Sequence, residues 1–221
     1  MDTSKNHILG VCILALALGS SGWMVYRDYS LRHAQTMRDV TRGASIREWR
    51  SLADSGTVLR RGTSDAPLIL VFSDYECPAC RRLERSLDSL WQERPERFTE
   101  VLRHYPLSIH PNAVNAAIAA ECAATIGVLP ALTTRLFAEQ DSLTKPRIRE
   151  ALAQVAPTPA RAKAGICFDE AQTASRVMRD ARLAKSLKLA GTPAFVIGGA
   201  VYYGGFGVDS MRQFLGLGKG K

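Results

Sequence analysis

Cys77-Pro78-Ala79-Cys80 lies between an apolar run at residues 68–72 and a helix-like segment at residues 81–91. A strand followed directly by a helix delivers Cys77 to the helix N-terminus, where unpaired N–H groups and the helix dipole stabilise a thiolate. Cysteines placed in this way have pKa values lowered from about 8.5 to between about 3.5 and 7.5. The pattern therefore predicts a redox site in which Cys77 is the nucleophile.

The neighbours of Cys77 fit the same chemistry. Cys80 lies one helical turn further on, where it can reach back and resolve a mixed disulfide by intramolecular attack. Pro78 suits the first helical position because its missing N–H would be unpaired there. Asp74 and Glu76 oppose the thiolate, whereas the arginines after the motif favour it. A zinc site is the alternative, but it needs four ligands and no second pair has ligand spacing, so we predict no metal and no cofactor.

Length and composition predict one ordinary domain with short appendages. The chain has 221 residues, of which 46% are hydrophobic and 23% are charged, which is enough for one substantial core. Its net charge of +8 is spread along the sequence. Nucleic-acid binding requires a concentrated basic patch with base-reading or stacking groups, and no such motif is present, so we expect no nucleic-acid partner.

The first 26 residues form a segment apart from the predicted domain. Residues 8–26 are uncharged and mostly apolar, and a helix of that length, at about 1.5 Å per residue, approaches the roughly 30 Å of a bilayer core. We therefore favour a retained signal anchor at residues 1–26, followed by a stem at residues 27–54. A cleaved signal peptide is the alternative, because the strongest apolar stretch spans only residues 8–18.

Whether this segment is a retained anchor or a cleaved signal peptide, it would direct the domain across a membrane, to the periplasm or the cell exterior. The charge pattern points the other way, because arginines at positions 27, 32, 38 and 42 follow the apolar segment and positive flanks usually stay in the cytoplasm. Against this we weigh the cysteine usage and the short leader, since disulfides persist outside the cytoplasm.

Cys122 and Cys167 lie outside the redox motif and are predicted to form a structural disulfide. The bond would close a loop of about 45 residues and would stabilise the fold by about 3 to 4 kcal/mol in the chain-entropy picture. The alternative is a pair of buried free cysteines that pack as small hydrophobic residues. We favour the disulfide because the expected compartment is oxidising.

The remaining pattern predicts a mixed α/β domain at residues 55–217. Strands, including a terminal hairpin with a Gly198-Gly199 turn, are expected at 57–60, 68–72, 98–105, 194–197 and 201–203. Helices are expected at 81–91, 113–125, 129–140, 147–155, 169–189 and 208–215. Residues 110–189 are almost wholly helical in pattern, which indicates a helical insertion between two strand-bearing halves.

This order of strand, helix, strand, helical insertion, hairpin and helix resembles the thioredoxin-like superfamily, and more narrowly the DsbA-type thiol:disulfide oxidoreductases. The resemblance rests on Cys77-Pro78-Ala79-Cys80 at the head of the first helix and on Gly191-Thr192-Pro193 before the hairpin. It implies that Pro193 is a cis-proline packed against the disulfide and that Thr192 offers backbone groups to a bound peptide strand. A proline has no N–H to donate, which leaves Thr192 to pair with an incoming extended chain.

Two positions depart from the family pattern. Ala79 replaces a histidine that helps to stabilise the thiolate in DsbA, which implies a weaker oxidant. Val71 stands six residues before Cys77, where thioredoxin and DsbA keep a buried carboxylate for proton transfer. Asp74 and Glu76 are the nearby carboxylates that could substitute for it, although neither is at the matching position.

These features predict a membrane-anchored oxidoreductase whose Cys77–Cys80 disulfide oxidises cysteine thiols of extracytoplasmic proteins. A substrate thiolate attacks Cys77, and the second substrate thiol resolves the mixed disulfide. By analogy, a membrane redox partner would reoxidise the enzyme. One alternative is a disulfide reductase or isomerase that runs the same steps in reverse. Another is a non-catalytic module that binds peptides or a metal beside Pro193.

Overall fold

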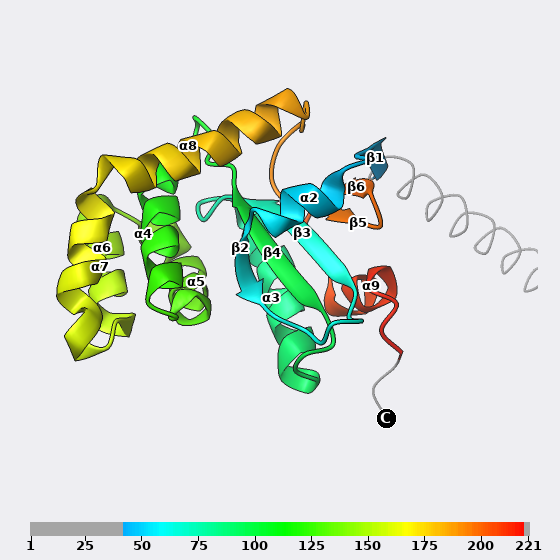
Figure 1. The fold of residues 1–221 in the computed structure, drawn as a ribbon, viewed down its shortest axis with the longest axis horizontal. Coiled ribbons are helices and arrows are strands. Elements are labelled where there is room, and N and C mark those ends of the chain that lie inside the picture. The colour runs from blue at the N-terminus through cyan, green and yellow to red at the C-terminus, as the bar shows by residue number, and fades with distance from the viewer. Residues whose placement is uncertain (1–41, 219–221) are drawn as a thin grey trace, which may run out of the picture. The chain divides into compact units, whose positions relative to one another are not determined.

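A mixed β-sheet lies at the centre of the computed structural model, which describes residues 42–218 (Figure 1). In sheet order the strands are β1 (Arg42–Ser45), β6 (Ala200–Tyr203), β5 (Ala194–Ile197), β3 (Leu68–Ser73), β4 (Thr99–His104) and β2 (Thr57–Arg60). β3 is parallel to β4 and antiparallel to β5, whereas β2 is antiparallel to β4. β3 is therefore an interior strand, and the motif at residues 77–80 follows it directly.

The apolar run of β3 explains its interior position. A strand that is buried on both faces is typically a continuous hydrophobic run rather than an alternating one. Ile69 and Val71 pack with residues of α3 (Pro78–Glu93) and α9 (Val208–Phe214) on one face. Leu70 and Phe72 pack on the opposite face with α8 (Ala171–Ser186) and α2 (Trp49–Asp54). Helices thus cover both faces of the sheet at the strand that leads into the motif.

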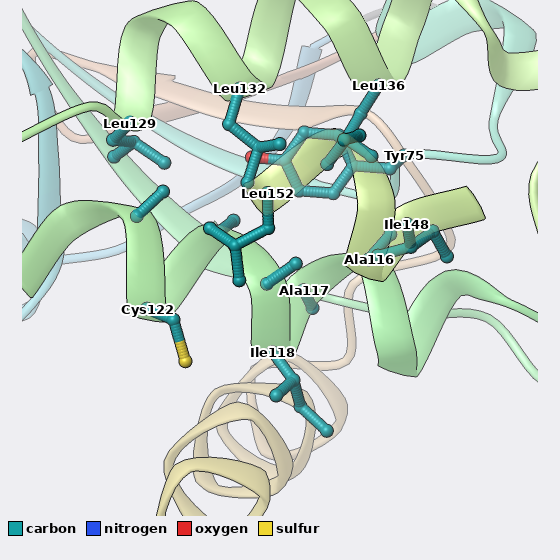
Figure 2. Close-up of a cluster of buried hydrophobic side chains, with 14 of the residues drawn as sticks. Tyr75, Ala116, Ala117, Ile118, Cys122, Leu129, Leu132, Leu136, Ile148 and Leu152 are labelled. Atoms are coloured by element: carbon teal, nitrogen blue, oxygen red, sulfur yellow. The ribbon is translucent and has the colours of Figure 1, made fainter. Parts of the chain in front are cut away.

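A helical insertion follows β4, as predicted. It comprises α4 (Ala113–Thr125), α5 (Leu129–Ala138), η1 (Gln140–Ser142), α6 (Lys145–Val155), η2 (Thr158–Ala160) and α7 (Arg161–Asp169). The alanine-rich α4 lies at its centre, because small side chains such as Ala116 and Ala117 let neighbouring helices approach closely. Figure 2 shows this cluster, with Tyr75 from the loop after β3 beside Leu132 and Leu136. The active-site loop thus contributes a side chain to the core of the insertion.

The fold extends beyond the predicted boundaries at two places. Residues 42–54 were expected to form part of a stem, but β1 joins the sheet and Trp49 of α2 is buried against it. The apolar face formed by Ile46, Trp49 and Leu52 is what binds this segment to the sheet. The predicted insertion ran to residue 189, but α8 packs against the sheet strand β4 as well as α4. The separate helix α7 was not predicted.

The anchor predicted at residues 1–26 lies outside the described residues, as does most of the stem. Within residues 42–218, no helix combines the length and the apolar character that crossing a bilayer requires.

A disulfide joins Cys122 in α4 to Cys167 in α7, with the Cα atoms 5.7 Å apart and 45 residues between them in sequence. Replacing both cysteines by alanine should lower the free energy of unfolding by about 3 to 4 kcal/mol, because the unfolded chain regains the freedom of that loop. Urea denaturation measures this change, and the alkylation rate of Cys77 in the folded variant serves as the control. A loss below about 1 kcal/mol would contradict the prediction.

The loop after β6 approaches the first turn of α3 closely. A Cβ atom added at Gly205 would overlap the carbonyl oxygen of Ala79 and would lie 2.8 Å from the Cβ of Arg82. Because a backbone atom cannot move aside cheaply, Gly205→Ala should lower the free energy of unfolding by about 1 to 3 kcal/mol, measured by urea denaturation. Gly165→Ala is the control, because its Cβ, within helix α7, would meet only the Arg149 guanidinium at an ordinary contact distance of 3.8 Å, and the substitution should raise the free energy of unfolding by up to about 1 kcal/mol. Equal effects of both substitutions would show that the contact is unimportant.

Candidate active site

Cys77 is positioned by the start of α3. It is the N-cap residue and has extended backbone angles, and Pro78 begins the helix after it. The Cys77 sulfur lies 3.3 Å from the carbonyl oxygen of Thr192, to which its thiol donates a hydrogen bond. The peptide bond between Thr192 and Pro193 is cis. Two segments that are 115 residues apart in sequence thus meet at one sulfur atom.

The two thiols of the motif differ in their acidity. The hydrogen bond from the Cys80 thiol lowers the pKa of Cys77 to about 5, with further contributions from the Thr192 side chain and from backbone N–H groups at the helix start, whereas burial opposes the shift. Burial raises the pKa of Cys80 well above its usual value, and the bond to Cys77 adds to this effect. Cys77 is also the more exposed of the two residues, at 6% against 1%. The geometry therefore distinguishes a nucleophilic thiolate from a buried thiol.

Asp74 ties the loop before α3 to the loop after β4. Its buried carboxylate accepts hydrogen bonds from the backbone N–H groups of Glu76 and Leu107, both at 2.8 Å. The same carboxylate lies 2.7 Å from Nδ1 of His110. The N–H of Asp74 donates to the sulfur of Cys80 at 3.5 Å. Both carboxylate oxygens of Asp74 therefore accept hydrogen bonds that fix the active-site loop.

Two further contacts hold this loop against the helical insertion. Glu76 accepts hydrogen bonds from the backbone N–H of Asn112 at 2.6 Å and from its side-chain amide at 3.3 Å. The buried Gln140 of η1 donates from Nε2 to the carbonyl oxygens of Tyr75 at 2.7 Å and Cys77 at 3.0 Å. The insertion thus fixes the backbone on which the nucleophile is carried.

The structure gathers one group of predicted residues at this site: Asp74, Glu76, Cys77, Pro78, Cys80, Thr192 and Pro193. The Cys122–Cys167 disulfide lies in the insertion instead. The sequence analysis did not identify Gln140, because its partners are 63 and 65 residues away and no local pattern marks it.

The cysteines that a four-thiolate zinc site would need are not available together, because Cys122 and Cys167 are bonded to each other. Within residues 42–218, no group of three or more Cys, His, Asp and Glu side chains is arranged to hold a metal ion. What the arrangement offers chemically is an acidic thiol with a second thiol one helical turn away, which is the set of groups that thiol–disulfide exchange requires.

Comparison with known proteins gives the same fold. A family model described as thioredoxin matches residues 54–216. The Na(+)/H(+) antiporter NhaA 1 of Mycolicibacterium gilvum is 31% identical over 232 residues, which cover 99% of this chain and 34% of that protein. The chain therefore spans about a third of the length of the curated relatives it matches.

Two solved structures share the fold. The catalytic domain of Proteus mirabilis ScsC superposes with a TM-score of 0.64 at 21% identity, over 76% of this chain and 93% of that chain. The thiol-disulfide exchange protein alpha-DsbA2 from Wolbachia pipientis gives a TM-score of 0.65 at 14% identity, over 76% and 91% of the two chains. Together with the family match, these similarities show a thioredoxin-like fold.

The low pKa of Cys77 has a direct kinetic consequence. Because only the thiolate is alkylated, the iodoacetamide reaction of the reduced protein should have its midpoint near pH 5 and should slow as the pH falls below it. Mass spectrometry should place the label on Cys77, with Cys80 unmodified at pH 7. A Cys77→Ser variant, which should lack this fast reaction, is the control. A midpoint near the pH of about 8.5 typical of free cysteine would contradict the proposed electrostatics.

Proposed function

Because the chain belongs to the thioredoxin family, we propose that it is a thiol:disulfide oxidoreductase that exchanges its Cys77–Cys80 disulfide with cysteines of other proteins. One observation carries the proposal. The Cys77 sulfur lies at the N-terminus of α3, within hydrogen-bond distance of Thr192, and its pKa is well below that of an ordinary cysteine. A thiol of this kind is both a good nucleophile and a good leaving group at neutral pH.

In the proposed reaction the substrate is oxidised by two electrons and the enzyme is reduced. A substrate thiolate attacks the sulfur of Cys77, the Cys77–Cys80 bond breaks, and Cys80 leaves as a thiolate that takes up a proton. A second substrate thiolate then attacks the substrate sulfur of the mixed disulfide, and Cys77 leaves as a thiolate. An extended substrate segment would pair with the backbone groups of Thr192.

The oxidising direction follows from the stability of the reduced form. A thiolate that is stabilised at Cys77 lowers the free energy of the dithiol state, and the disulfide then oxidises its partners more readily. Ala79 brings no further cation to the motif. We therefore propose an oxidant that is weaker than DsbA.

We propose that the domain works outside the cytoplasm and is anchored by residues 1–26. The Cys122–Cys167 disulfide supports an oxidising compartment. A membrane redox partner would return Cys77 and Cys80 to the disulfide after each turnover. The antiport activity named for the curated relatives is not part of this proposal, because the chain covers about a third of their length.

A disulfide reductase or isomerase is the alternative within the same chemistry, with Cys77 attacking a substrate disulfide. The reduction potential of the Cys77–Cys80 pair, measured against glutathione, distinguishes the two directions. About 30 mV corresponds to 1.4 kcal/mol for this two-electron couple. A potential above about −200 mV supports the oxidant, and a value near the −270 mV of thioredoxin supports the reductase.

Trapping of mixed disulfides tests the proposed exchange. Cys80→Ser should accumulate mixed disulfides that form when its Cys77 thiolate attacks a client disulfide, because the variant has no Cys80 thiol to attack the Cys77 sulfur and release the client. Non-reducing electrophoresis followed by mass spectrometry detects these species and identifies the clients. Cys77→Ser should form none and should abolish oxidation of a reduced model protein. Unchanged activity of Cys77→Ser in cells would instead support a non-catalytic binding module.

A further inference from the structure

A small cavity is lined by Cys80 and not by Cys77. Its volume of about 10 Å³ is about the smallest that holds one water molecule. Its polar lining includes Cys80, Tyr75 and two carboxylates, Glu84 of α3 and Glu100 of β4. Glu84 and Glu100 therefore line the same small space as the buried Cys80.

These two carboxylates belong to a buried ionic cluster around Arg60 of β2. Arg60 pairs with Glu100 and, at 2.6 Å, with Glu84, and it also reaches the half-exposed Asp88 at 3.0 Å. The exposed fractions of Arg60, Glu84 and Glu100 are 5%, 8% and 1%. The Arg60 guanidinium thus pairs with two carboxylates, those of Glu84 and Glu100, and both are buried.

Such a cluster retains a proton near neutral pH. Charged carboxylates are costly to bury, and two that lie close together cannot both ionise easily. Burial raises the pKa of Glu100 well above that of an ordinary glutamate, the Glu84 charge raises it further, and Arg60 acts in the opposite direction. Glu100 can therefore give up or accept a proton under the conditions in which thiols exchange.

Exchange at Cys77 requires a proton carrier behind Cys80. When the Cys77–Cys80 bond breaks, Cys80 leaves as a thiolate in a site where burial raises its pKa. The family position for a buried carboxylate holds Val71, and Asp74 is committed to the loop after β4. Burial raises the pKa of Tyr75 too far for it to serve as the base.

We propose that Glu84 and Glu100, held together by Arg60, transfer the proton to and from Cys80 across this cavity. The inference rests on the proposed exchange reaction at Cys77. When a substrate thiolate opens the disulfide, a carboxylic acid of the pair protonates the departing Cys80 thiolate and becomes a carboxylate. When the disulfide is formed again, the carboxylate takes the Cys80 proton, the resulting thiolate attacks the Cys77 sulfur of a mixed disulfide, and the bond to the partner sulfur breaks so that the partner leaves as a thiolate.

The charged and titratable groups that face the pair come from each neighbouring element. They are Arg60 of β2, Asp88 and Cys80 of α3, and Tyr75 of the loop after β3. Ser73 of β3 and Thr133 of α5 are the uncharged hydroxyl groups that line the same cavity, and Thr133 bonds to Tyr75 at 3.1 Å. Asp88 shares Arg60 but does not line the cavity, so it provides a matched control.

The test isolates the step in which Cys80 attacks. Reduced protein is mixed with oxidised glutathione, which forms a disulfide with Cys77, and the release of glutathione as Cys80 attacks Cys77 is followed by acid quench and mass spectrometry from pH 5 to pH 9. In Glu84→Gln/Glu100→Gln this release should be at least about tenfold slower than wild type at pH 7. Its rate should rise about tenfold per pH unit, because hydroxide must then remove the proton.

The controls separate proton transfer from a structural effect. Asp88→Asn should keep the wild-type pH profile, and the alkylation midpoint of Cys77 should stay the same in every variant. If the double variant does not fold, adding Arg60→Met removes the buried cation as well, since an apolar replacement of a buried ionic cluster is often tolerated. The same steepened pH profile is expected there.

The outcomes are distinct. A pH profile of wild-type shape in the glutamine variants, whether or not all rates are uniformly lower, would overturn the proton-transfer inference and leave the exchange reaction intact. A wild-type protein that forms no disulfide with glutathione at Cys77 would overturn both.

Discussion

The sulfur of Cys77 is held between the first turn of α3 and the carbonyl oxygen of Thr192, and the rest of the domain serves to bring these two together. The antiparallel register of β3 and β5 places Phe72 opposite Ala194. The residues after Phe72 and before Ala194 therefore leave the sheet at the same edge. Because β3 is buried on both faces, a shift in this register would cost core packing as well as the active site.

The helical insertion is part of the active site and not merely an addition to the fold. Tyr75, two residues before the nucleophile, packs in the core of the insertion, with its ring centroid 5.0 Å from that of Phe137. Gln140 reaches from the insertion to the carbonyl oxygens of Tyr75 and Cys77. The loop that carries Cys77 is thus fixed by the sheet on one side and by the insertion on the other, which leaves little freedom in the position of the sulfur.

The parts of this fold that the sequence predicts are those with a strong local signal. The unbroken apolar run before Cys77 predicts β3, the alanine-rich stretch predicts α4 to the residue, and the Gly198-Gly199 turn predicts the hairpin. β1 was missed because its four residues, Arg42-Gly43-Ala44-Ser45, include no β-branched or aromatic side chain that would indicate a strand.

The buried ionic cluster was missed for a different reason. Arg60 meets Glu84 and Glu100 across 24 and 40 residues, and charged residues within strand and helix patterns are normally taken as solvent-facing. One local signal did exist, because Glu84 follows Cys80 by four residues and therefore lies on the same face of α3. Its significance depends on β2 and β4, which only the folded chain brings into contact with that face.

The acidity of Cys77 and the proposed proton transfer at Cys80 have a common origin. The hydrogen bond that the Cys80 thiol donates lowers the pKa of Cys77 and raises that of Cys80, so one proton shared between two sulfurs stays on the buried one. Activating the first thiol therefore makes the second harder to ionise. The backbone N–H groups at the helix start add to the stabilisation of the Cys77 thiolate, but they provide no acceptor for the proton of Cys80. In the proposed mechanism that acceptor is a pair of carboxylates within the core, and Arg60 offsets the cost of burying them.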